Sequence, residues 1–399
     1  MENSNAQRSD IARLERWTGR QALRVVSTDV RCIDCGREPV GKSVGLRLTG
    51  KLDNLASGFS GLSSCGRIWL CPVCNAKVMA ERALEIALVL AWAEREGLHV
   101  LFGSLTVRHN ASSDLRDLLN MQRFAWAFVS GGRVWGSQSA TVTVEGAHSV
   151  KCSSDCSTKH RRTIDGGGDG RVGYIRAAEL TIGANGWHPH FHPIVLVRGS
   201  KRFAHTVAAS LVQEWIHGVE KFGGEARAEG GQQMRVLGPE TAFESIVGYV
   251  TKQTYSRSQR LALEAVWSQG KRSRGRAHST APHWVLLEDA AAGDYSRISR
   301  WDELESAVRQ HRMITWSRGL RDFAGVGIEI EDEDIAAREV GSAEDTVCFI
   351  TPDGWNAIRD NPAQLVGYLD VLRRSGWPLL RELFILDGVD FFELEMAAA

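Results

Sequence analysis

Two neighbouring segments in the middle of the chain have the hydrophobic pattern of β-strands. Residues 173–182 and 186–197 are rich in β-branched and aliphatic residues and have strand-like lengths. Asn185-Gly186 lies between them, and this dipeptide is the strongest short-range signal for a two-residue hairpin turn. The pattern therefore predicts an antiparallel hairpin with Asn185 and Gly186 as its turn.

The second of these strands places two histidines on one face. His190 and His192 are two residues apart, and side chains alternate between the faces of a strand. With Asn185 and Gly186 as the turn, residue 184 pairs with residue 187, and Glu179 lies directly opposite His192. Imidazole and carboxylate groups bind divalent metals, so the hairpin predicts a metal site with positions left open for water or a phosphate oxygen.

An alternative for the histidines is that backbone partners satisfy them. A longer loop at residues 183–186 would also shift the strand register and break the pairing of Glu179 with His192. The sequence leaves both alternatives open.

A helix is predicted over residues 240–252, which follow Pro239 and carry apolar residues at 242, 246, 249 and 250. Tyr249 and Lys252 share a face of this helix because they are three residues apart. A phenol has a pKa of about 10, so as a nucleophile it needs a nearby positive charge or a polarised electrophile. The alternative is an amphipathic helix in which Tyr249 only packs.

Cysteines occur in two sets near the N-terminus. Cys32 and Cys35 form one Cys-x-x-Cys pair, and Cys71 and Cys74 form another. With no secretion signal in the chain, this spacing favours a four-thiolate zinc site over disulfides, with Cys65 as a spare or substitute ligand. Free structural thiols are the alternative. A further set of metal-binding residue types recurs at every fourth position: His148, Cys152, Cys156 and His160. This set could form a second zinc site, but a flexible insertion is favoured there.

Composition places the protein among ordinary globular chains. Its 399 residues are 43% apolar and 24% charged, which suffices for two or more cores. The first ten residues are polar, unlike a signal peptide, and the apolar helix expected at residues 83–92 is too short to span a bilayer. We expect a soluble cytoplasmic protein without a membrane partner.

The net charge of zero conceals an uneven distribution of charge. Residues 329–399 contain 5 basic and 16 acidic residues, whereas residues 1–328 contain 43 basic and 32 acidic ones. A Gly/Ser-rich stretch after the predicted tyrosine helix has a cluster of cations that would bind DNA phosphates: Arg257, Arg260, Lys271, Arg272, Arg274 and Arg276. Trp267 and Trp284 would stack on unpaired bases. The alternative for the basic stretch is a solvated loop without a DNA partner.

The acidic run at residues 329–334 is typical of a linker or a charge-repelling boundary. Residues 355–381 beyond it have a helical pattern, whose function the sequence does not reveal.

Taken in order, these motifs resemble the rolling-circle replication initiators of small bacterial plasmids. This is the single-tyrosine group of the nucleases named for a histidine-hydrophobic-histidine motif. The first motif of that family, an apolar strand ending in Thr and a polar turn, matches residues 101–110. The metal motif matches residues 188–192, the nucleophile motif matches 248–252, and the cysteine cluster at 65–74 is similar to one that precedes the catalytic domain.

The resemblance implies an α+β fold in which a central antiparallel sheet has helices on one face and the metal motif in its middle. It implies that Glu179, His190 and His192 bind Mg²⁺ or Mn²⁺, and that Tyr249 attacks a phosphate of single-stranded origin DNA, presented in a hairpin or double-strand origin. The products would be a 5′-phosphotyrosine and a 3′-hydroxyl primer, with strand rejoining at termination. Host helicase and DNA polymerase are the further partners implied.

One position departs from the family. Its members carry a glutamate one helical turn before the tyrosine, where it activates water for the closing step, and this chain has Ser245 there. Glu244 lies about 140° around an ideal helix from Tyr249, so the role passes to Glu244 only if the helix is distorted. Tyr255 as a second nucleophile, or another carboxylate, is the alternative.

We therefore predict three regions: an N-terminal zinc-bearing segment (1–95), a catalytic domain (96–328) and an acidic linker with a helical C-terminal appendage (329–399). Alternative functions are a transposase or relaxase of the same nuclease class, a metal-dependent hydrolase resembling the amidohydrolases, and a zinc-containing origin-binding protein without catalysis.

Overall fold

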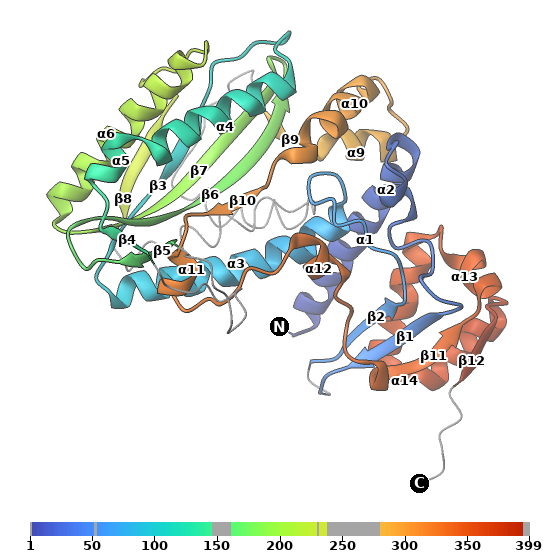
Figure 1. The fold of residues 1–399 in the computed structure, drawn as a ribbon. Coiled ribbons are helices and arrows are strands. Elements are labelled where there is room, and N and C mark those ends of the chain that lie inside the picture. The colour runs from blue at the N-terminus through green and yellow to red at the C-terminus, as the bar shows by residue number, and fades with distance from the viewer. Residues whose placement is uncertain (1, 52–53, 146–160, 230, 238–279, 394–399) are drawn as a thin grey trace.

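A long β-hairpin lies at the centre of the larger of two main sheets. The computed structural model describes residues 2–51, 54–145, 161–229, 231–237 and 280–393 (Figure 1). The hairpin consists of β6 (Gly170–Gly183) and β7 (Gly186–Arg198), paired antiparallel along their whole length. Its sheet has the order β10-β6-β7-β3-β8, and β9 also pairs with β6. The remaining strands are β3 (His99–Thr106), β8 (Gln233–Leu237), β9 (Ala281–Pro282) and β10 (Ile314–Trp316).

The pairing of β3 with β7 and β8 confirms the expected apolar strand that ends in Thr106. Strand β7 is the middle strand of the sheet, and residues 193–197 are buried throughout because neighbours cover both of its faces. The metal motif therefore lies in the middle of an antiparallel sheet.

Two helices cover one face of this sheet, α4 (Leu115–Gly131) and α6 (Lys201–Lys221) (Figure 1). Phe191 of β7 packs edge-on against Trp126 of α4 and also contacts Trp215 of α6. Since neighbouring residues of a strand face opposite ways, the side chains of His190 and His192 lie on the face away from α4 and α6. Beyond α4 follow α5 (Arg133–Ser137) and a ribbon of β4 (Thr141–Glu145) and β5 (Arg161–Asp165).

The N-terminal region is built on two long helices, α1 (Glu2–Val26) and α3 (Pro72–Arg95). Pro72 opens α3, where its missing N–H leaves no helical hydrogen bond unmade, and this helix contains the predicted segment 83–92. The cysteines lie between the two long helices, beside the short helix α2 (Val30–Asp34). Helices α9 (Val285–Ala291) and α10 (Ile298–Ala307) complete this side of the protein.

The second main sheet joins the two ends of the chain. Its order is β12-β11-β1-β2, so β1 (Val44–Thr49) of the N-terminal region pairs with β11 (Thr346–Ile350) near the C-terminus. The other strands are β2 (Ala56–Ser60) and β12 (Phe391–Glu393), and helices α13 (Pro352–Ile358) and α14 (Pro362–Leu386) pack on the sheet. Helices are present where the pattern at 355–381 predicted them, but the C-terminal region is not purely helical.

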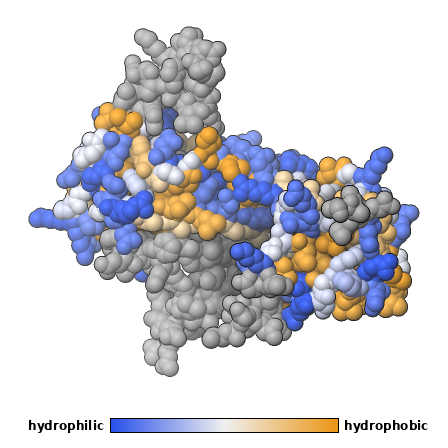
Figure 2. All heavy atoms as spheres, turned by 90° about the horizontal axis from the view of Figure 1, so that it is seen from below, coloured by the Kyte–Doolittle hydropathy of each residue, from blue (hydrophilic) through white to orange (hydrophobic). Residues whose placement is uncertain are grey.

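None of the helices in the described parts of the chain is long and apolar enough to cross a membrane. Figure 2 shows hydrophobic and hydrophilic residues interleaved over the face that is seen from below. A few large apolar side chains of α14 are exposed, among them Ile385 and Leu386.

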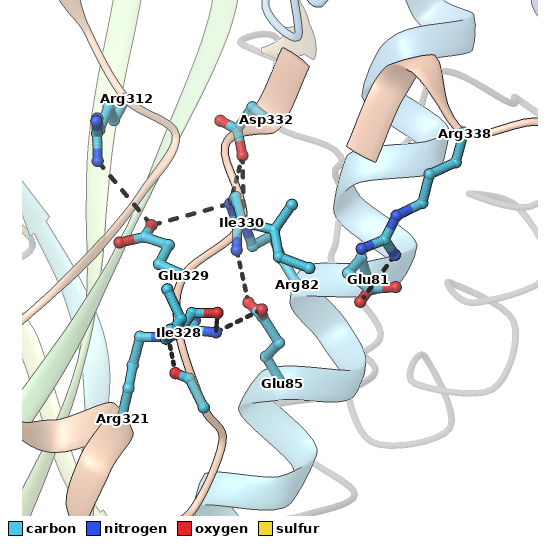
Figure 3. Close-up of polar contacts among 11 residues, drawn as sticks. Glu81, Arg82, Glu85, Arg312, Arg321, Ile328, Glu329, Ile330, Asp332 and Arg338 are labelled. Atoms are coloured by element: carbon cyan, nitrogen blue, oxygen red, sulfur yellow. Dashed lines mark hydrogen bonds and ion pairs between the residues drawn. The ribbon is translucent and has the colours of Figure 1, made fainter. Parts of the chain in front are cut away.

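The acidic run at 329–334 does not form a free linker, which corrects the expectation from its charge. Arg82 of α3 is 2% exposed, and its guanidinium donates to Glu85 at 2.8 Å, to Asp332 at 2.7 Å and to the Ile330 carbonyl at 2.6 Å (Figure 3). Arg321 of α11 (Leu320–Phe323) donates to the other oxygen of Glu85 at 2.7 Å. The run docks on α3 because buried guanidinium groups there require anionic partners.

The docking continues on either side of this buried centre. Arg312 lies 4.0 Å from Glu329, and Arg338, just after α12 (Asp332–Ala337), lies 3.2 Å from Glu81 (Figure 3). Burial alone would raise the pKa of the Glu85 carboxyl, but its bonds to Arg321 and Arg82 hold that pKa below the ordinary value. The cluster is thus ionised at neutral pH and fixes the start of the C-terminal region.

Replacing Arg82 by Met should lower the free energy of unfolding by about 3–5 kcal/mol, because it leaves the carboxylates of Glu85 and Asp332 short of a buried partner. Urea unfolding followed by circular dichroism would measure the change. The matched control is Arg381→Met, which removes the half-exposed ion pair to Glu393 and should change stability by at most about 1 kcal/mol. Equal losses in the two variants would contradict a structural role for the buried cluster.

Candidate active site

The turn of the central hairpin differs by one residue from the expected one. Ala184 and Asn185 form the turn, and Gly183 pairs with Gly186, so Glu179 lies opposite His190 rather than His192. Gly186 has a φ of +80°, and among the described residues only glycines have positive φ. Neither Ala184 nor Asn185 has a positive φ, whereas the predicted turn would need Asn185 in the left-handed region.

The corrected register keeps the predicted site intact. It is shifted by two residues, and side chains in a strand repeat their direction every two residues. Glu179 of β6 therefore stays on the face of His190 and His192 and reaches both of them. One oxygen, Glu179 Oε2, lies 2.9 Å from His192 Nε2 and 3.6 Å from His190 Nδ1.

Backbone contacts hold the orientation of the His192 ring. Its Nδ1 lies 3.0 Å from the carbonyl oxygen of Gly103 on β3, so Nδ1 carries the proton and Nε2 points to Glu179. Metal-binding histidines are oriented in this way, with one nitrogen bonded to a backbone carbonyl and the other left for the ion. The backbone of the neighbouring strand packs so closely on Gly103 that a side chain would not fit there, because a Cβ would lie 1.7 Å from the Gln233 carbonyl oxygen.

The end of β3 is fixed beside His190 by its own set of bonds. Thr106 pairs with His190 across the sheet, and its N–H donates to Gln232 Oε1 at 2.8 Å. Its carbonyl oxygen accepts from Trp215 Nε1 and from Gln232 Nε2, both at 3.0 Å. The first family motif thus lies against the metal motif, and its threonine supports the position of His190.

The three side chains fit a divalent metal ion. One donor atom from each of Glu179, His190 and His192 lies within 4.8 Å of the others. His190 Nε2 is buried and has no hydrogen-bond partner among the described residues, which is unfavourable in the absence of a ligand. Burial opposes ionisation of Glu179, but the two histidines hold the pKa of its carboxyl well below the ordinary value, so it is anionic.

Two further histidines extend the site, His188 and His109, and neither had a predicted role of its own. The His188 ring packs edge-on against His190 with centroids 4.0 Å apart, and the His109 ring lies 4.5 Å from that of His188. Burial, with the neighbouring His190 and His109, lowers the pKa of His188 to about 3, so its ring is neutral at physiological pH. His188 could have been predicted to lie beside His190 and His192, because alternate residues of a strand share a face. His109 is far away in the sequence, and only the fold brings it to them.

The cysteine cluster forms a second group of potential ligands. Cys35, Cys65, Cys71 and Cys74 are buried, and their sulfur atoms lie within 4.8 Å of one another. The Cys35–Cys71 and Cys65–Cys74 sulfur separations are 3.7 and 3.5 Å. Four thiols at this spacing suit a tetrahedral zinc site.

Cys65 thus lies in the group of four thiols and Cys32 does not. Cys32 lies inside helix α2, whereas Cys35 is the C-cap residue at which the chain leaves that helix. Gly66 turns the chain with a φ of +63° directly after Cys65 and brings this thiol into the group. Hydrogen bonds from Cys35, Cys65 and Cys71 hold the pKa of Cys74 well below its ordinary value.

Comparison with known proteins places the chain in a family. Protein rep of Streptomyces lividans is 31% identical over 341 residues, which cover 75% of this chain and 73% of that protein. The chain belongs to the Rep protein family. Neomycin resistance protein of Streptomyces cyanogenus is 36% identical over 171 residues, 39% of this chain and 37% of its own length. No family model and no solved structure gives a significant match.

Membership of the Rep family confirms the resemblance to plasmid Rep proteins. The assignment to the histidine-hydrophobic-histidine nucleases stays a prediction, as do the roles of individual site residues. Several residues assigned from the sequence lie outside the described residues: Tyr249, Lys252, Glu244, Tyr255, Trp267, the basic cluster from Arg257 to Arg276, and the set from His148 to His160. Trp284 is described and is 1% exposed in the core, so stacking on DNA bases is not its role.

We expect this Rep family member to bind one zinc ion through the four clustered thiols. Cys65→Ser should lose the zinc, whereas Cys32→Ser should retain it, because the Cys32 thiol is outside the group of four. Inductively coupled plasma mass spectrometry of the purified variants would measure the metal. Zinc retained by Cys65→Ser and lost from Cys32→Ser would restore the ligand set first expected from the sequence.

Mn²⁺ should bind at the hairpin site, and His190→Ala should weaken this binding at least about tenfold, as the loss of a ligand does. Electron paramagnetic resonance titration of free Mn²⁺ would measure the affinity. His109→Ala is the control, since it removes an imidazole of the same row that is not among the three ligands. Equal affinity in wild type and His190→Ala would show that the histidine pair is not a metal site.

Proposed function

We propose that this protein initiates rolling-circle replication of a plasmid by nicking single-stranded DNA at the origin and joining itself to the cut strand. Membership of the Rep family supports a role in replication. The observation that carries the nicking activity is the convergence of Glu179, His190 and His192 on the face of the central hairpin that lies away from α4 and α6.

The geometry suits a phosphate as the electrophile. The three side chains lie on the face of the sheet away from α4 and α6, and the packed hairpin fixes their mutual positions before any substrate arrives. A bound Mg²⁺ or Mn²⁺ would supply positive charge that stabilises the developing charge on the scissile phosphate. The buried backbone partner of His192 keeps the ligand set in place while DNA enters and leaves.

Tyr249 would be the nucleophile of this reaction. Its phenolic oxygen forms a bond to phosphorus and the bond from phosphorus to the 3′-oxygen breaks, so that the electron pair of this bond goes to the 3′-oxygen. The proton lost by the tyrosine is balanced by protonation of that oxygen, which becomes the 3′-hydroxyl primer. Because one phosphodiester replaces another, the reverse reaction can rejoin strands without ATP, and Lys252 would favour the phenolate by its positive charge.

Termination needs a second activation step, for which Glu244 is the proposed base because Ser245 occupies the usual position. The cations from Arg257 to Arg276 would hold the DNA backbone. Plasmid origin DNA is the direct partner in this proposal. Host helicase and DNA polymerase would act on the opened strand, in the cytoplasm.

The proposal predicts a covalent protein–DNA adduct. With Mn²⁺ and a single-stranded origin oligonucleotide labelled on the 3′ side of the nick, wild type should give a shifted band on denaturing gels, and Tyr249→Phe should give none. Tyr295→Phe, which alters an exposed tyrosine of the loop before α10, is the control. An undiminished adduct in Tyr249→Phe would refute the nucleophile assignment.

His190→Ala and His192→Ala serve to separate catalysis from binding in the same assay. Both should keep origin affinity within about a factor of three at moderate salt while losing the adduct, since the ligands act on the transition state and the basic residues hold the strand. Parallel loss of binding and cleavage would favour the alternative of a structural histidine site in an origin-binding protein.

A further inference from the structure

A row of arginines runs along one face of helix α1. Arg13, Arg16, Arg20 and Arg24 are spaced by three, four and four residues, so all four lie within a narrow sector of the helix. The face they occupy is not the solvent side. Arg20 is only 7% exposed, and the Arg24 side chain is also 7% exposed.

Three of these arginines line a cavity of about 300 Å³. Helix α1 forms one wall, and β2, the cysteine segment, the residues after α12 and helix α14 form the others. The half-buried rings of Trp17 and Phe59 also line it and lie 6.2 Å apart. The metal-site residues Glu179, His190 and His192 do not, so this cavity is separate from the candidate active site.

The guanidinium groups in the cavity form no ion pair within the described parts of the chain. Asp10 and Glu15 lie near Arg13 and Arg16, but Asp10 pairs with Arg373. No ion pair is found there for Arg13, Arg16 or Arg20, and Arg13 Nη1 and Arg20 Nε are buried without a hydrogen-bond partner. Glu339, an acidic residue of the lining, is engaged by Arg47 at 2.9 Å and by the Gly61 N–H. Buried charges without a partner are unfavourable, so the cavity is built for an anion.

The environment of these groups supports the same conclusion. Burial, together with the nearby Arg13, lowers the pKa of the Arg16 guanidinium to about 10. Burial and the neighbouring Arg373 lower the pKa of Arg13 as well. Both groups remain charged at neutral pH, and their mutual repulsion would be relieved by a bound anion.

The cysteine cluster would compensate the positive charge at only one end of the arginine row. Cys35 and Cys74 line the cavity, and a zinc ion with four thiolates would carry net negative charge. Arg24 lies at that end and donates to the Cys35 carbonyl and to Asp360. Arg16 is about 12 Å farther along the helix and Arg13 is farther still, so the attraction of the cluster falls off along the row.

We propose that this cavity binds a nucleoside phosphate, with Arg13, Arg16 and Arg20 on the phosphate and the Trp17 and Phe59 rings against the base. Guanidinium groups are the preferred donors to phosphate, and aromatic rings stack on any base. The nucleoside phosphate is either a free nucleotide or one unit of a DNA strand. The site does not depend on the nicking reaction.

Thermal unfolding of the full-length, zinc-containing protein tests the proposal with three probes. These are deoxyadenosine monophosphate, deoxyadenosine without phosphate, and a short oligodeoxyadenylate. A phosphate-bearing probe at a hundredfold excess over its Kd should raise Tm by about 3 °C, and deoxyadenosine should not. A shift with the mononucleotide assigns a free nucleotide as a sufficient ligand, and a shift with the oligonucleotide alone assigns a DNA strand.

Arg16→Met and Arg13→Met identify the site of binding. Each removes an unpaired buried charge, so the Tm without ligand should be unchanged or higher while the ligand-induced shift is lost. Arg374→Met removes the same charge from the half-exposed surface of α14 and should keep the shift. Absence of a shift with both phosphate-bearing probes in wild type, or a full shift in both cavity variants, would overturn the proposal.

Discussion

The antiparallel pairing of β6 and β7 is the constraint on which the candidate active site depends. It sets Glu179 beside His190, and the neighbouring β3 then supplies the Gly103 carbonyl that orients His192. Because β7 has strands on both edges and helices on one face, its position is determined by many independent contacts. The two histidines favour the anionic form of Glu179, so the packed sheet can hold a carboxylate and two imidazoles together before an ion binds.

Much of this arrangement could be predicted from the sequence because it follows from periodicity. The two strands, their face and the approach of Glu179 to the histidines depend only on the alternation of side chains. The turn was misplaced because Asn185-Gly186 is compatible with two turn types that differ in register by two residues. The shared two-residue period is also the reason that this error did not change which residues meet.

Contacts between segments far apart in the chain could not be predicted from the sequence. The group of four thiols contains Cys65 rather than Cys32 because a short helix and a glycine turn orient the thiols, which spacing alone does not encode. Trp284 looked available for DNA because basic residues precede it in the sequence, yet it is buried in the core. The acidic run looked like a linker because its partner Arg82 is about 250 residues away along the chain.

Buried arginines have opposite surroundings in two parts of the molecule. Arg82 donates to two carboxylates and a backbone carbonyl, so its charge is compensated within the fold and serves to join the C-terminal region to α3. Arg13 and Arg20 form no ion pair among the described residues, and Arg13 Nη1 and Arg20 Nε are buried without a hydrogen-bond partner. Since carboxylates bind Arg82 directly, the missing ion pairs of Arg13 and Arg20 point to a charge that the fold leaves for an external phosphate.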